Sequence, residues 1–178
     1  MKKFVLYIAM SIDGYIAKHD DDISWLSIVE REGEDYGYHD FIQSVDTVIL
    51  GRKTYTKVMS MTDEFPHKHK KTYILSRTPK ANEGNIEYYN GNIAALLEKI
   101  RKENTMQGIV FCDGGADIVQ QCLQTHLFDT IIISIIPILL GGGIRLFSSE
   151  YPLQRMELVR SATFPSGLVQ VWYKKYEE

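Results

Sequence analysis

The chain has 178 residues, a net charge of −3, 44% hydrophobic residues and 24% charged residues. These values fit one compact domain over residues 1–178 and exclude a disordered or fibrous protein. A small negative charge without a basic block argues against a nucleic-acid partner. The longest apolar stretch, from Ile131 to Leu140, contains Ser134 and Pro137 and is about half of the ~20 residues that a membrane span needs, so no membrane segment is expected.

Two further features of the sequence bear on the redox setting of the chain and on metal binding. Cys112 ends an apolar run and Cys122 lies on an apolar helical stripe, which favours buried thiols over a disulfide and indicates a reducing, cytoplasmic setting. The cluster from His67 to Lys71 lacks nearby cysteine or carboxylate partners in a periodic frame. We therefore expect a solvated loop there and no metal.

The hydrophobic pattern predicts alternating strands and helices along the chain. Short β-branched runs predict strands over 4–9, 15–16, 47–50, 72–75, 86–89, 109–111 and 129–136. Spacings of three and four predict helices over 38–45, 52–58, 93–100 and from 116 onward. Such alternation predicts an α/β fold with a mostly parallel sheet, closed at one edge by an antiparallel hairpin of residues 155–163 and 168–176.

The stretch from Val110 to Val119 reads as a strand, a tight turn at Gly114-Gly115 and a helix. A helix that begins at a glycine pair presents unpaired N–H groups at the positive end of its dipole, which suits a phosphate. An ordinary strand-to-helix turn is the alternative interpretation of this segment alone.

Two other loops that follow strands carry residues suited to phosphate. Gly51-Arg52-Lys53-Thr54 opens a helix with cations and a hydroxyl, and Ser76-Arg77 adds a further cation and hydroxyl. Ligands bind beyond the carboxyl ends of strands in such sheets, so the loops together could hold a dinucleotide with an extra phosphate. Solvated loops are the alternative, since neither Gly-x-Gly-x-x-Gly nor Gly-x-x-x-x-Gly-Lys occurs.

Six motifs follow one another along the chain: Ser11–Ala17, Trp25, Ile49–Tyr55, Tyr73–Arg77, Cys112–Gly115 and Ile136–Gly143 with Leu146-Phe147. In this order they resemble the dihydrofolate-reductase-like superfamily, and most closely the free-standing relatives of the reductase domain in the bifunctional riboflavin-biosynthesis deaminase/reductase. The resemblance implies a three-layer fold with a mostly parallel central sheet, helices on both faces and a C-terminal antiparallel hairpin.

The resemblance implies an NADPH-dependent reductase that transfers a hydride to a C=N bond of a heterocycle or a ribosylamino-pyrimidine, similar to 5-amino-6-(5-phosphoribosylamino)uracil reductase. Dihydrofolate reduction, or a dimer that binds a nucleotide or other ligand without turnover, are the alternatives. By similarity, the cofactor would contact Ala9, Ile16, Ala17, Gly51, Arg52, Lys53, Thr54, Leu75, Ser76, Arg77, Gly114, Gly115, Ala116 and Asp117.

Reduction of a C=N bond also needs a proton, and the resemblance offers two donors. Asp13 lies in the Ser-x-Asp-Gly turn that is typical of riboflavin-type reductases, and Glu30 follows the matching tryptophan, Trp25, in competition with Glu32, Glu34 and Asp35. An Asx turn at Asp13 and a solvated face at Glu30 are the alternatives. Ser11, Asp13 and Trp25 are the candidate substrate-binding residues.

One residue departs from the family pattern. Asp113 stands where dihydrofolate reductases usually carry another glycine, and a carboxylate there would repel a pyrophosphate if it pointed inward. The resemblance also implies a homodimer, with the isoleucine-rich strand 129–136 and the C-terminal hairpin as the expected contact. Helices of the same chain are the alternative cover for this strand.

Overall fold

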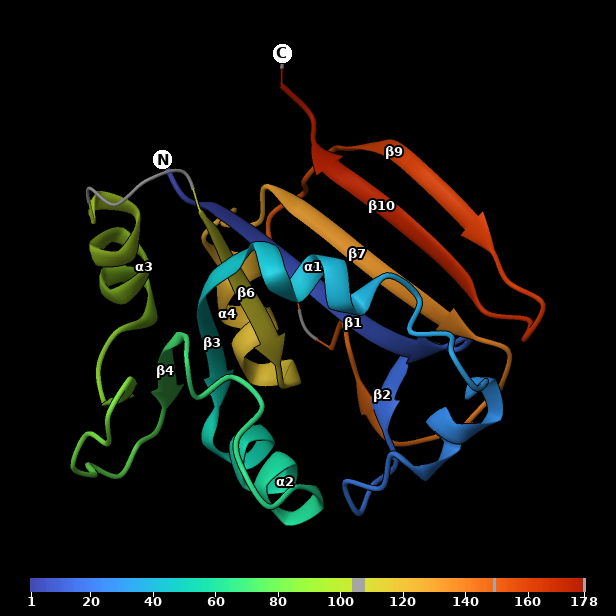
Figure 1. Ribbon diagram of the computed structural model, residues 1–178. Coiled ribbons are helices and arrows are strands. Elements are labelled where there is room, and N and C mark those ends of the chain that lie inside the picture. The colour runs from blue at the N-terminus through green and yellow to red at the C-terminus, as the bar shows by residue number, and fades with distance from the viewer. Residues whose placement is uncertain (104–107, 149, 178) are drawn as a thin grey trace.

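The computed structural model in Figure 1 describes residues 1–103, 108–148 and 150–177, and an eight-stranded sheet runs through its centre. Six neighbouring strands are parallel, the seventh, β10, is antiparallel to its neighbour among them, and the last, β9, is antiparallel to β10. In sheet order the strands are β5 (Ile86–Tyr89), β4 (Lys71–Leu75), β3 (Val45–Gly51), β6 (Ile109–Gly114), β1 (Lys3–Ser11), β7 (Thr130–Ile136), β10 (Val169–Lys175) and β9 (Met156–Thr163).

Helices cover both faces of this sheet (Figure 1). On one face, α3 (Ile93–Lys102) and α4 (Ala116–Gln124) pack on alternate residues of β1, β3, β6 and β7. On the other, α1 (Tyr38–Ser44) and α2 (Arg52–Met61) pack on β3, β4 and β6. Because the central strands are buried on both faces, they are apolar on both sides, as parallel strands usually are.

A second, two-stranded sheet joins β2 (Tyr15–Ala17) to β8 (Ile144–Arg145), and a 3-10 helix, η1 (Ser24–Val29), follows β2. The approach of the two strands requires glycine at position 143. Gly143 has φ +137°, and a Cβ there would lie 2.1 Å from the carbonyl oxygen of Ala17. The small sheet therefore depends on a residue without a side chain.

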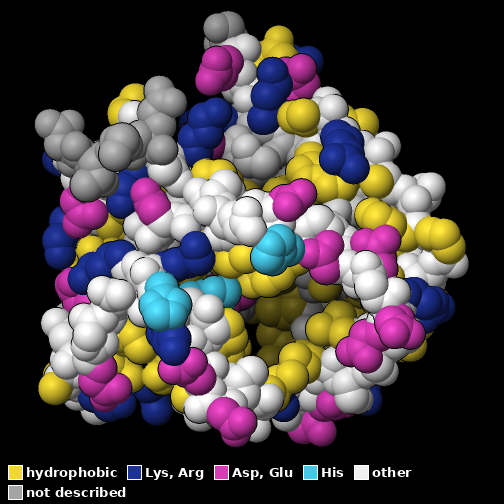
Figure 2. Space-filling view, in the orientation of Figure 1, with side chains coloured by type: hydrophobic (Ala, Val, Ile, Leu, Met, Phe, Trp, Pro, Cys, Tyr) yellow, Lys and Arg dark blue, Asp and Glu magenta, His cyan; other side chains and the backbone are white. Residues whose placement is uncertain are grey.

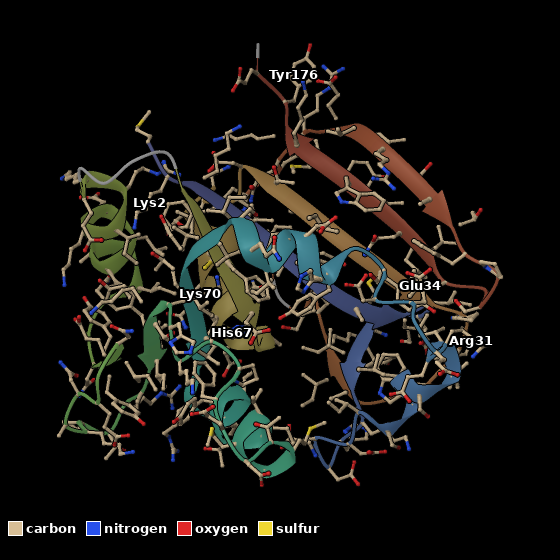
Figure 3. All side chains as sticks on the ribbon, in the orientation of Figure 1. Lys2, Arg31, Glu34, His67, Lys70 and Tyr176 are labelled. Carbon is tan, nitrogen blue, oxygen red and sulfur yellow. The ribbon has the colours of Figure 1, made fainter. Side chains whose placement is uncertain are left out.

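The predicted parallel sheet, antiparallel hairpin and two helical layers are confirmed, while three local predictions were wrong. Val45 begins β3 rather than ending the preceding helix, and β6 continues through Gly114 before the chain turns. His67 does not lie in a solvated loop: it is buried between the rings of Phe65 and Phe111. Figure 3 shows His67 and Lys70 beneath α1, next to the sheet.

The second half of the His67–Lys71 segment is tied to the sheet as well. Lys70 Nζ donates a hydrogen bond to the carbonyl of Val45 over 2.7 Å.

No helix in the described residues is long and apolar enough to cross a membrane.

Candidate active site

Two helix N-termini meet at the carboxyl ends of the neighbouring strands β3 and β6. Gly51 precedes α2 and Gly115 precedes α4, and neither helix has a side-chain cap on its first N–H groups. A Cβ on Gly51 would lie 3.8 Å from the backbone nitrogen of Gly115, and one on Gly115 would lie 3.1 Å from Thr54 Oγ1. The two glycines thus bring two free helix N-termini close together, an arrangement suited to an anion.

The next strand end carries the third predicted loop. Leu75 ends β4, which is paired with β3, so Ser76 and Arg77 follow at the same edge of the sheet. The Ser76 hydroxyl donates to the carbonyl of Thr78 and accepts from its N–H, which fixes the turn, and the Arg77 side chain is exposed. The structure therefore brings together the three loops that were predicted to bind phosphates, with Arg52 and Lys53 exposed at the start of α2.

A cleft of about 240 Å³ opens on the α1 face, beside the ends of β1, β6 and β7. Figure 2 shows a hollow on this side of the molecule with a floor of hydrophobic side chains. Tyrosines, aliphatic residues and two carboxylates form its lining, which consists of Tyr7, Ile8, Ala9, Leu26, Val29, Asp35, Tyr36, Tyr38, Phe111, Asp113, Ser134, Ile136 and Leu168.

Asp113 points into this cleft because it shares a face of β6 with Phe111, while Cys112 and Gly114 alternate to the other face. The partial burial of its carboxyl raises the pKa of Asp113 to about 7. Burial, and then the nearby Asp113 charge, raise the pKa of Tyr38 above its ordinary value. Asp113 is thus a carboxylic acid that exchanges its proton near neutral pH. A protonated Asp113 removes the repulsion that the sequence suggested toward a pyrophosphate.

Asp35 is the other carboxylate of the cleft, and its environment lowers its pKa instead of raising it. Its two oxygens accept hydrogen bonds from the backbone N–H groups of His39 and Gly37, both at 2.9 Å, at the start of α1. These bonds lower the pKa of Asp35, the His39 bond most. The cleft therefore pairs one ionised carboxylate with one that is protonated near neutral pH, a division that is typical of acid–base sites.

A buried polar network supports the floor of the cleft. Gln170 on β10 is fully buried, and its Nε2 donates to Tyr7 Oη and to Ser134 Oγ, both over 2.8 Å. Tyr7 Oη donates in turn to the carbonyl of Tyr36 over 3.0 Å. Burial raises the pKa of Tyr7, so this hydroxyl keeps its proton. Three strands and the loop before α1 are thereby held in register around the cleft.

Asp13, a predicted proton donor, lies in the turn between β1 and β2 and is not part of the lining of the cleft. Its Oδ1 accepts from Ser11 Oγ at 2.6 Å and from the N–H of Leu140 at 3.1 Å, and its Oδ2 accepts from the N–H of Gly141 at 2.8 Å. These bonds, that of Ser11 foremost, lower the pKa of Asp13 to about 2. A carboxylate in this state holds no proton at neutral pH. The geometry makes Asp13 a link between the β1–β2 turn and the loop before β8.

The other predicted donor and substrate contacts lie outside the lining of the cleft. Glu30 is exposed at the end of η1, and Figure 3 shows that Glu34 is also on the outer loop before α1. Ser11 is buried under the β1–β2 turn. Trp25 is buried behind the cleft wall, against Val29, Ile136 and Leu168.

Of the predicted cofactor contacts on β1 and β2, only one lies at the cleft. Ala9 lines it, whereas Ile16 and Ala17 lie on β2, on the side toward β8. Sequence reasoning missed the lining residues Tyr7, Tyr38 and Ser134, and the buried Gln170. The sequence held a signal for Tyr7, because Tyr7 alternates with Ala9 along β1 and so shares its face of the sheet. Nothing in the sequence links Gln170 to these two residues.

Comparison with known proteins identifies the family. The RibD C-terminal domain family matches residues 2–170. The uncharacterised protein YwjB of Bacillus subtilis strain 168 is 41% identical over 147 residues, covering 82% of this chain and 83% of YwjB. A putative riboflavin biosynthesis protein from Shewanella sp. PV-4 superposes with a TM-score of 0.88 and 26% identity, over 98% of this chain and 99% of that chain.

The fold is also that of dihydrofolate reductase. The enzyme from Enterococcus faecalis, in a complex with NADP(H), superposes with a TM-score of 0.65 at 16% identity, over 98% of this chain and 97% of that chain. The match along nearly the whole sequence, together with the parallel sheet and its hairpin, shows that the chain belongs to the RibD C-terminal domain family and has a dihydrofolate-reductase-like fold.

Proposed function

We propose that the protein is an NADPH-dependent reductase that transfers a hydride to a C=N bond of a heterocyclic or ribosylamino-pyrimidine substrate, with Asp113 as the proton donor. The observation that carries this proposal is the position of Asp113. It immediately precedes Gly114-Gly115 at the anion-binding edge and lines the cleft. Membership of a reductase-domain family supports the same chemistry.

The chain has a cradle that fits a dinucleotide. The two free helix N-termini at Gly51 and Gly115 would hold the pyrophosphate, because both begin at glycines, which carry no Cβ, and these glycines lie close together. Arg77, in the loop after β4, would pair with the 2′-phosphate through its planar fork. When bound, the reduced nicotinamide supplies the hydride.

Asp113 would donate its carboxyl proton to the substrate nitrogen, which becomes the nitrogen of an amine. The Asp113 carboxylate that remains would regain a proton from solvent. A donor with a pKa of about 7 is well matched to work at neutral pH. The lining around Asp113 is mostly aromatic and aliphatic.

Titration with NADPH and NADH, followed by nicotinamide fluorescence, tests the cofactor assignment first. We expect saturable binding with a preference for NADPH, and then NADPH oxidation with one of a panel of C=N-containing pyrimidines and pteridines. Failure of both cofactors to bind would reject the reductase and favour a ligand-binding protein without turnover.

We also propose a homodimer in a cytoplasmic setting. Ile131 and Ile133 of β7 line a shallow apolar pocket with Met156 and Tyr173 of the hairpin, and the hairpin strand β9 forms one free edge of the sheet, so this region could receive a partner. Leu158 and Val159 on this strand are 52% and 59% exposed, which favours a covered edge. Cys112 and Cys122 are buried free thiols, in keeping with a reducing compartment. Light scattering after size exclusion would give the mass that tests the dimer.

A further inference from the structure

The cleft contains negative charge without a compensating cation. Asp35 and Asp113 are acidic, and none of the described residues in the lining is a lysine, arginine or histidine. Asp35 is ionised, because two backbone N–H groups stabilise its charge. A phosphate group in the cleft would therefore lie near at least one carboxylate and find no cationic partner, which is strongly unfavourable.

The size of the cleft adds a second restriction. Its volume of about 240 Å³ lies below the roughly 300–1,000 Å³ that is typical of pockets for larger ligands. A heterocycle of one or two rings would occupy this space, and a longer arm would extend past the exposed rim. Asp35 is itself an exposed lining residue, so a phosphate on such an arm would meet its charge there.

We infer that the cleft selects a planar nitrogen heterocycle that carries no phosphate group. This inference rests on the proposed function, in that it takes the cleft as the substrate site. It narrows that function, because it excludes the phosphorylated ribosylamino-pyrimidine as the preferred substrate and leaves its dephosphorylated form or another unphosphorylated heterocycle.

The remaining groups of the cleft fit such a ring. Aromatic rings stand along one wall, with Tyr38 5.7 Å from Tyr7 and 6.5 Å from Phe111 between ring centroids. Rings of this kind attract electron-poor or protonated heterocycles. The carboxylate of Asp35 accepts hydrogen bonds from ring N–H or amino groups, and Ser134 Oγ, which accepts a bond from Gln170, can donate its own proton to a ring acceptor.

A matched ligand pair tests the inference directly. The probes are 6-hydroxymethylpterin and its phosphate monoester, titrated at pH 8 without any cofactor and followed by pterin fluorescence. We expect the monoester to bind on the order of 100-fold more weakly, because it brings two negative charges toward the carboxylates. Equal or tighter binding of the monoester, or binding of neither probe, would overturn the inference.

Charge-removing variants show whether the carboxylates cause the preference. Asp113→Asn and Asp35→Asn keep the side-chain shape, and asparagine at position 35 can still cap α1. Each should reduce the preference by about tenfold. Glu30→Gln is the control, because it removes an exposed carboxylate that does not line the cleft. A preference that survives in the Asp35→Asn/Asp113→Asn double variant would contradict the inference.

The outcome is distinguishable from that of the proposed function. Binding and oxidation of NADPH are measured on the same preparation, while the pterin pair is compared without NADPH. A preference for the free pterin without NADPH binding would retain the inference and reject the reductase. NADPH binding without a preference for the free pterin would support the reductase and overturn the inference.

Discussion

Thr54 Oγ1 lies 3.1 Å from the position that a Cβ on Gly115 would take, so the hydroxyl of one helix start faces the backbone of the other. We expect Gly115→Ala to weaken NADPH binding by roughly tenfold, ~1.4 kcal/mol, because the new methyl group crowds Thr54 and occupies the anion cradle. Fluorescence titration measures the change. Gly141→Ala, in open space away from the cradle, is the control. Unchanged affinity in Gly115→Ala would place the pyrophosphate elsewhere.

Arg77 is expected to distinguish the two nicotinamide cofactors. Arg77→Ala should weaken NADPH binding by roughly tenfold to a hundredfold and leave NADH almost unchanged, since only NADPH has the 2′-phosphate that this guanidinium would pair with. Calorimetric titration of both cofactors measures the ratio. Arg155→Ala, an exposed arginine that stacks on Tyr176, should change neither affinity. An equal loss for both cofactors would refute the assignment.

Asp113 should control how activity depends on pH. The acid form donates the proton, so turnover is expected to fall as pH rises through about 7. Asp113→Asn should lower kcat at least 100-fold while cofactor binding persists. Steady-state rates across pH 5 to 9, with cofactor affinity measured in parallel, make the comparison. A variant that keeps kcat and the alkaline limb would show that another group supplies the proton.

The same carboxyl links stability to pH. Its pKa is raised in the folded state, so its stabilising contribution is complete below its ordinary pKa and is lost as pH rises through about 7. Asp113→Asn should accordingly be more stable than the wild type at pH 8, by about 1–3 kcal/mol, and similar near pH 4. Chemical denaturation at both pH values would measure the difference.

Gly143 allows the two small strands to meet. Gly143→Ala should destabilise the protein by about 3 kcal/mol or more, because its Cβ would collide with the Ala17 carbonyl and its φ of +137° disfavours a side chain. Gly141→Ala also replaces a glycine of positive φ, +70°, but meets open space, and should cost only about 1 kcal/mol. Thermal unfolding of both variants compares them. Similar losses of stability in the two variants would mean that β2 and β8 can move apart without a cost in the free energy of unfolding.

The sequence predicted the elements well where local pattern and burial agree. The spacing of Ile93, Leu96, Leu97 and Ile100 predicted α3, and all four side chains are buried. His67 was placed wrongly because its neighbours Lys68 to Lys71 are polar, and the aromatic pair that buries it includes Phe111, far along the chain. Burial through such distant contacts leaves no periodic pattern.

The edge where the N-termini of α2 and α4 meet was more predictable than the cleft. Glycine at the start of α2 and α4 is a local signal for a free helix N-terminus, whereas the state of a carboxyl depends on its surroundings. Asp13 and Asp113 are each followed by glycine, yet three hydrogen bonds ionise the first and burial protonates the second near neutral pH. The sequence alone therefore could not show that the pKa of Asp113 is raised while that of Asp13 is lowered.

Gln170 joins Tyr7 across 163 positions of sequence, so the floor of the cleft unites an early strand with a very late one. During synthesis the Gly51 and Gly115 loops emerge well before the strand that carries Gln170. Contacts between residues so far apart in the sequence also form slowly after the chain has left the ribosome. The edge where the N-termini of α2 and α4 meet can thus form before β10 is added, while the floor of the cleft becomes complete only with that strand. A chain truncated before β10 would keep the two helix N-termini together without a finished cleft.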